Sequence, residues 1–60
     1  MLRLKSRTYA GLVYWVNPTH IVKAWVDKDG ITRVEQSTGA IIYVMETPEQ
    51  IADYMRRLNK

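Results

Sequence analysis

The hydrophobic positions of the chain follow two different periods. Up to residue 46 the apolar residues occur in short runs that largely alternate with polar ones, which is typical of strands with one buried face. These runs predict strands at about 2–8, 12–16, 21–28, 31–37 and 40–46. Beyond residue 47 the apolar residues recur at i, i+3, i+4 and i+7; they are Ile51, Tyr54, Met55 and Leu58. This spacing predicts a helix over about 48–59 with one apolar stripe.

The boundaries between these segments carry residues typical of turns. Asp29-Gly30 and Thr38-Gly39 predict two hairpins, because glycine readily adopts the positive φ that tight hairpin turns need. Tyr9-Ala10-Gly11 is the predicted turn between the first two strands. Asn17-Pro18 ends the second strand, since proline has no N–H to donate to a strand ladder, and one helical turn is an option for the segment that follows.

The clearest local signal is the start of the helix at Thr47-Pro48-Glu49-Gln50. Thr47 is the predicted N-cap, and Pro48 occupies the first helical position, where its missing N–H costs nothing. Gln50 stands three residues after the cap, which is the spacing of a capping box.

The fifth predicted strand is apolar on both faces, so it needs cover on both sides. The helix covers one face, and a curled sheet or a second subunit covers the other. In the third predicted strand we expect Val22, Ala24 and Val26 to point inward, which leaves Ile21 and Trp25 on the outer face. The predicted fold is therefore a single α+β domain over residues 1–60: a bent or barrel-like antiparallel sheet of about five strands with a C-terminal helix packed on it.

The size of the chain favours self-association. Sixty residues without cysteine form a small core with no disulfide or thiolate metal site to reinforce it. Oligomerisation is the remaining common remedy, so we expect a homo-oligomer. No segment has the length and apolarity of a membrane span or of a signal peptide, and we therefore expect a cytoplasmic protein without membrane insertion.

Positive charge is concentrated at the start of the chain. The formal net charge is +3, and residues 1–24 contain basic side chains but no acidic ones; they are Arg3, Lys5, Arg7 and Lys23. The first three alternate with apolar residues and so share one strand face. This stripe is either a contact surface for phosphate or an acidic partner, or a solvated face that protects a strand edge.

The sequence predicts no catalytic, cofactor-binding or metal-binding residues. His20 is the only histidine, and it has neither a cysteine nor a nearby acid with which to form a nucleophilic or metal-ligating set. We therefore expect a protein that is not an enzyme.

The aromatic residues are a further unusual feature, with two Trp and four Tyr but no Phe. Tyr14 and Trp15 are neighbours on a strand and must face opposite ways, so at least one large aromatic lies outward. Such residues suit a protein interface or base stacking, although burial in the core is a third interpretation. The predicted interface consists of Trp15, Ile21, Trp25 and Tyr43.

Residues 12–58 resemble the FlbD/SwrD family of very small proteins found with flagellar genes. The resemblance consists of Asn17-Pro18-x-His20-Ile21-Val22, a glycine-turn hairpin, and Ile42-Tyr43-Val44-x-Glu46-Thr47-Pro48-Glu49-Gln50-Ile51. It implies a small accessory protein without catalytic residues that acts through protein contacts. An accessory protein of a phage or mobile element is an alternative origin.

Together these features predict a protein–protein interaction module that acts through self-association or another protein partner. The alternative is a nucleic-acid-binding module, in which Arg3, Lys5, Arg7 and Lys23 contact phosphates and an exposed aromatic stacks on bases.

Overall fold

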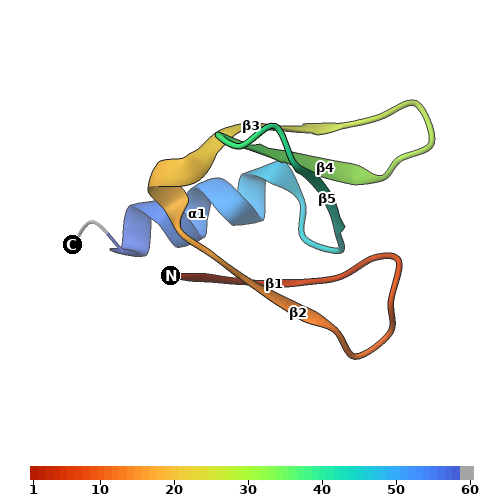
Figure 1. Ribbon diagram of the computed structural model, residues 1–60, viewed down its shortest axis with the longest axis horizontal. Coiled ribbons are helices and arrows are strands. Elements are labelled where there is room, and N and C mark those ends of the chain that lie inside the picture. The colour runs from red at the N-terminus through yellow and green to blue at the C-terminus, as the bar shows by residue number, and fades with distance from the viewer. Residues whose placement is uncertain (59–60) are drawn as a thin grey trace.

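The computed structural model describes residues 1–58 and has the predicted α+β architecture of five strands and one C-terminal helix (Figure 1). The strands are β1 (Leu2–Lys5), β2 (Val13–Val16), β3 (Ile21–Val26), β4 (Thr32–Gln36) and β5 (Ile41–Val44), and the helix is α1 (Pro48–Leu58). One turn of 3-10 helix, η1 (Pro18–His20), separates β2 from β3. Each strand lies within its predicted range and is shorter. Residue 59, the predicted end of the helix, lies outside the described residues.

The strands form two antiparallel sheets, β1-β2 and β3-β4-β5. An isolated bridge between Ser6 and Val44 connects them, just beyond the end of β1. Two backbone hydrogen bonds flank this bridge, from Arg7 N–H to the Tyr43 carbonyl and from Met45 N–H to the Lys5 carbonyl, both 2.9 Å. Within residues 1–58 no ladder joins β2 to β3, so the strands do not close into a barrel.

The core lies where the two sheets and α1 meet, with the helix between the sheets (Figure 1). The buried hydrophobic residues are Leu2, Leu4, Val16, Val34, Val44 and Ile51. From the predicted helix stripe, Ile51 is buried and Tyr54 and Met55 pack against the core, whereas Leu58 at the helix end is exposed. The first three residues of the apolar stripe, Ile51, Tyr54 and Met55, therefore set which face of the helix packs on the core.

The predicted faces of β3 are wrong at Ile21 and Val22, because the strand contains a β-bulge. The register with β4 shifts between Ile21 and Lys23, so Val22 is an extra residue in the ladder. The extra residue reverses the side-chain alternation before it, and Ile21 packs against the core instead of facing outward. The bulged Val22, expected inward, is 60 % exposed. Val26 shares the face of Ala24, as expected, but is 51 % exposed at the end of the strand, and only Ala24 of that set packs on the core.

The predicted helix start is confirmed in atomic detail. The Gln50 N–H donates to Thr47 Oγ1 at 3.1 Å, and the Thr47 N–H donates to Gln50 Oε1 at 2.9 Å, which is the reciprocal pattern of a capping box. The hairpin prediction at Asp29-Gly30 is also confirmed, since Gly30 has a φ of +77° between β3 and β4. Within the described part of the chain, no helix is long and apolar enough to cross a membrane.

Candidate interaction surface

Three basic side chains lie in a row on the exposed face of β1 and the residue pair that follows it. Arg3, Lys5 and Arg7 are exposed, and the residues that alternate with them, Leu2, Leu4 and Ser6, are buried. The alternation predicted for this strand is therefore present. Arg7 is held in line by the hydrogen bond from its backbone N–H to the Tyr43 carbonyl, one of the two bonds that flank the Ser6–Val44 bridge.

An exposed aromatic stands beside the first of these cations. Trp15 on β2 is the cross-strand partner of Arg3, and its side chain is 63 % exposed. Val13 is the corresponding partner of Lys5. Cross-strand partners lie on the same face of a sheet, so the outer face of β1-β2 combines cations with apolar side chains.

The other two predicted interface aromatics share the outer face of the second sheet. The register places Trp25 opposite Arg33, and Arg33 opposite Tyr43, in one row across three strands. The Arg33 guanidinium lies 5.0 Å from the centroid of the Tyr43 ring, and Lys23 Nζ lies 4.8 Å from the Trp25 centroid. These are cation–π distances. Lys23 and Trp25 therefore lie together at the β3 edge, whereas Ile21 does not share their face.

The ion pairs show which cations have excess charge. Four basic residues contact a carboxylate: Lys23 with Glu35, Arg33 with Asp27, and both Arg56 and Arg57 with Asp53. Among residues 1–58, the basic side chains without such a pair are Arg3, Lys5, Arg7 and Lys28. Three of the four lie along β1. Most of the unpaired positive charge in the described chain thus lies along β1 and the two residues that follow it.

Asp27 organises the β3–β4 hairpin. Its Oδ1 accepts the N–H groups of Asp29 and Ile31 at 2.9 and 3.1 Å, and its Oδ2 accepts the Arg33 Nε–H at 2.7 Å. The hydrogen bond from Arg33, followed by that from the Ile31 N–H, lowers the pKa of the Asp27 carboxyl from its ordinary 3.8. These contacts give Asp27 a structural role in the turn.

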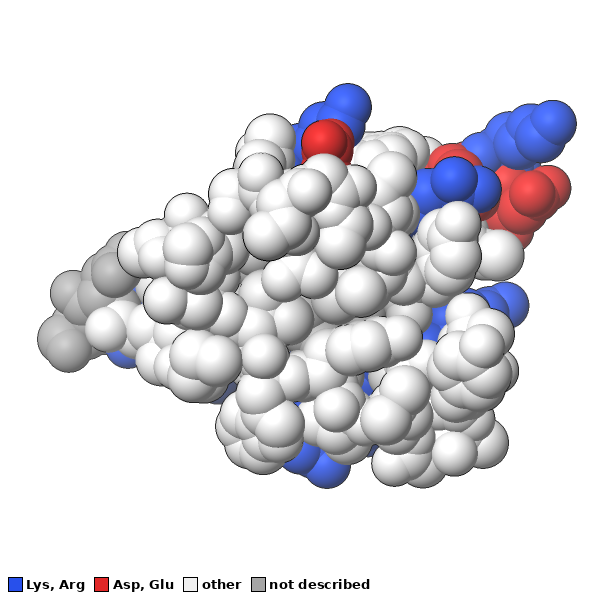
Figure 2. Space-filling view, in the orientation of Figure 1, with Lys and Arg blue, Asp and Glu red and all other residues white. Residues whose placement is uncertain are grey.

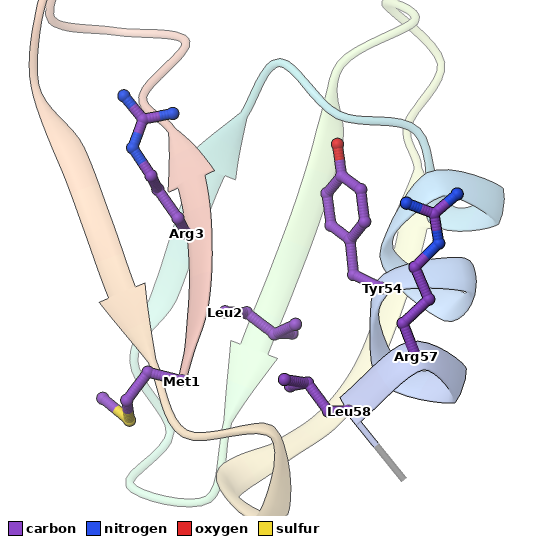
Figure 3. A pocket seen from close by; sticks show the side chains of 6 residues that line it. All are labelled: Met1, Leu2, Arg3, Tyr54, Arg57 and Leu58. Carbon is purple, nitrogen blue, oxygen red and sulfur yellow. The ribbon is translucent and has the colours of Figure 1, made fainter. Parts of the chain in front are cut away.

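Three adjoining hollows run along β1, and Arg3 lines all of them. The first lies between β1 and the end of α1 and is lined by Met1, Leu2, Arg3, Tyr54, Arg57 and Leu58 (Figure 3). The second adds Lys5, Met45, Glu46 and Gln50, and the third continues past Arg7 to the β1–β2 turn. We call the surface formed by Arg3, Lys5, Arg7, Tyr54 and Arg57 the β1 trough.

The sequence did not indicate that Tyr54 and Arg57 belong to this surface. Tyr54 belongs to the apolar helix stripe, and Arg57 lies in the last turn of the helix, where a basic residue complements the macrodipole. Figure 3 shows both side chains extending from α1 with their polar ends toward the same end of the hollow as the Arg3 guanidinium. Only the docking of the helix beside β1 brings them to the basic strand.

No protein-family model, curated protein or solved structure matches this chain. The resemblance to the FlbD/SwrD family therefore stays a prediction from the sequence motifs.

Proposed function

We propose that this chain is a non-enzymatic interaction module that self-associates by pairing β3 of one copy with β3 of a second. The observation that carries the proposal is the exposed edge of β3. It is the outer strand of its sheet and, at six residues, the longest strand of the fold. Val22 and Val26 expose more than half of their side chains there. An apolar edge of this kind is a template for pairing with another strand.

The balance between buried and exposed hydrophobic residues supports a partner surface. Among residues 1–58, six hydrophobic side chains are buried, and ten large ones are exposed. A single core in so small a domain supplies about 3–5 kcal/mol at most. The view in Figure 2 shows a broad surface largely without charged side chains, with Lys, Arg, Asp and Glu gathered at its margins. Burial of exposed apolar residues against a second copy adds to the small stabilisation that the core supplies.

The spacing of side chains on β3 suits a two-fold antiparallel pair. In a symmetric antiparallel pair, a two-fold axis perpendicular to the sheet relates the two strands. Residues opposite each other lie on the same face of the sheet, so the axis must pass through a residue and not between two residues. An axis at Ala24 brings Val26 of one copy to the level of the bulged Val22 of the other. It also places each Lys23 opposite the partner copy's Trp25. Both pairings are favourable, since the first buries two exposed valines and the second extends the Lys23–Trp25 cation–π contact across the interface.

Charge explains why β3 is a better self-association edge than β2. The other free edge of the fold is β2, which pairs with β1. Arg3 and Lys5 of β1 have no ion pair within residues 1–58. Pairing two copies there would bring like charges together. On β3, by contrast, Lys23 lies 3.9 Å from Glu35 of its own sheet.

The sequence resemblance agrees with this proposal. The FlbD/SwrD family implies a small accessory protein that acts through protein contacts and has no catalytic residues. The residues that carry the resemblance include His20-Ile21-Val22, so they reach the bulged start of the β3 edge.

The test is the mass of the native chain by size-exclusion chromatography with light scattering, at low and high salt. We expect a dimer in both conditions, because the pairing is made by backbone hydrogen bonds and apolar contacts. Val22→Lys should give a monomer, since it places a charge against Val26 of the other copy. Adding Val26→Glu to that variant should restore the dimer, because lysine then faces glutamate in both symmetric pairs.

A matched control is Leu12→Lys, which introduces the same charge at another exposed hydrophobic position. It should remain a dimer. A native chain that is monomeric at all accessible concentrations contradicts the proposal. A dimer that survives Val22→Lys shows that copies associate through another surface.

A further inference from the structure

We infer that the β1 trough binds single-stranded nucleic acid, a function that goes beyond self-association and does not depend on it. The three hollows of the trough adjoin one another along β1, because they share lining residues. Arg3 lines all three, Tyr54 lines the first two, and Lys5 lines the last two. A ligand can therefore follow β1 from the end of α1 to the β1–β2 turn.

The electrostatics of the trough favour an anion. Arg3, Lys5 and Arg7 have no ion-pair partner within residues 1–58. The acidic side chain that lines the trough is Glu46, which is buried and has both carboxylate oxygens within 3.2 Å of the Lys5 backbone N–H. Arg57 adds a fourth cation, although it shares Asp53 with Arg56. The surface therefore presents positive charge that the fold itself does not neutralise.

The arrangement of the cations suits an extended chain of charges rather than a compact anion. Alternate residues of a strand lie on one face, so Arg3 and Arg7 are separated by about 13 Å with Lys5 between them. Three cations spread along such a line can contact successive phosphates of an extended strand. A single phosphate group could engage only one or two of them.

Aromatic side chains on both neighbouring elements favour nucleic acid over an acidic peptide. Trp15 on β2 is highly exposed and stands opposite Arg3 beside the hollows, and the half-buried Tyr54 on α1 lines the first two hollows together with Arg3. Exposed aromatic rings beside a row of cations are the combination that binds single strands, because bases stack on the rings while the phosphates meet the cations. An acidic peptide would contact the cations, but its carboxylates have no flat rings to stack on the aromatic side chains.

The experiment is a titration of the full chain into a fluorescently labelled single-stranded oligothymidylate, followed by anisotropy. Three phosphate contacts predict a slope of about −2 in a plot of log association constant against log salt, or about 20-fold weaker binding between about 50 and 200 mM salt. Arg3→Glu with Arg7→Glu should abolish binding. Trp15→Ala should weaken binding by about fivefold or more without changing the salt slope, because stacking is insensitive to salt.

Lys28→Glu is the matched control for charge, since Lys28 is also exposed and without an ion pair within the described chain but lies in the β3–β4 turn. It should bind about as well as the native chain, and circular dichroism of each variant verifies folding. Three results would overturn the inference: no binding of the single strand by the folded chain, equal binding of a duplex of the same length, or tighter binding of a polyglutamate peptide. If Lys28→Glu and the single variant Arg7→Glu lose the same affinity for the single strand, binding depends on net charge and not on the trough, and the inference is likewise wrong.

Discussion

Glu46 accepts the backbone N–H of Lys5 through both carboxylate oxygens, at 3.0 and 3.2 Å, across 41 positions of sequence. The carboxylate is buried at the junction between β5 and α1. It therefore ties the first strand to the segment that begins the helix. Together with the Ser6–Val44 bridge, this contact joins the two sheets.

Replacement of Glu46 by alanine should lower the free energy of unfolding by about 1.5–3 kcal/mol, because it removes a hydrogen bond to a charged group and leaves the Lys5 N–H without an acceptor. Glu46→Gln retains one acceptor oxygen and should lose less. Urea denaturation of the three chains measures the differences. Equal stability of Glu46→Ala and the native chain would contradict this role.

The capping box should stabilise the chain measurably. Thr47→Ala is expected to lower the free energy of unfolding by about 0.5–2 kcal/mol, since it removes the acceptor of the Gln50 N–H. Thr47→Ser keeps that oxygen and serves as the control. Thermal unfolding followed by circular dichroism should rank native and Thr47→Ser together, above Thr47→Ala.

Asp27 should make the stability of the hairpin depend on acid pH. Its pKa is lowered in the folded chain by the hydrogen bond from Arg33, so the folded state binds fewer protons than the unfolded state near pH 3.8. The contribution of Asp27 is therefore complete above pH 3.8 and is lost as the pH falls through the lower folded pKa. Asp27→Asn should destabilise the chain at neutral pH and reduce the loss of stability in acid.

The control for this prediction is Asp29→Asn, a substitution in the same turn that leaves the Arg33 bond intact. Urea midpoints of the three chains at neutral pH and below pH 3.8 test the prediction. It fails if Asp27→Asn and Asp29→Asn show the same dependence on pH.

Pairing through β3 should make the melting temperature depend on protein concentration. An assembly that unfolds to separate chains is stabilised by mass action, so dilution should lower the melting temperature of the native chain. Val22→Lys should melt at a temperature that dilution does not change. Calorimetry over a wide range of protein concentrations distinguishes the two behaviours. A melting temperature of the native chain that does not change on dilution would contradict a dimer whose dissociation is coupled to unfolding.

The features that were predicted from sequence depend on residues close together in the chain. The Thr47–Gln50 capping box lies within four residues, and the alternation of Leu2 and Leu4 with Arg3 and Lys5 lies within a single strand. In each case the deciding interaction is local, so the identities of a few neighbours are sufficient. The number of strands and the position of the helix follow from the same patterns.

The features that escaped prediction depend on packing between distant segments. The β-bulge at Val22 is set by the register of β3 against β4, and one extra residue there reversed the expected orientation of Ile21. A strict alternation rule has no means of detecting it.

The sequence by itself determined the class of fold, the turns, the capped helix and the basic face of β1, because these arise from the spacing and chemistry of nearby residues. Only the tertiary structure decided that Val22 and Val26 form an exposed edge, that Glu46 holds Lys5, and that Tyr54 and Arg57 lie beside Arg3. The physical reason is that each of these depends on where the chain places segments far apart in sequence, through strand register and helix docking.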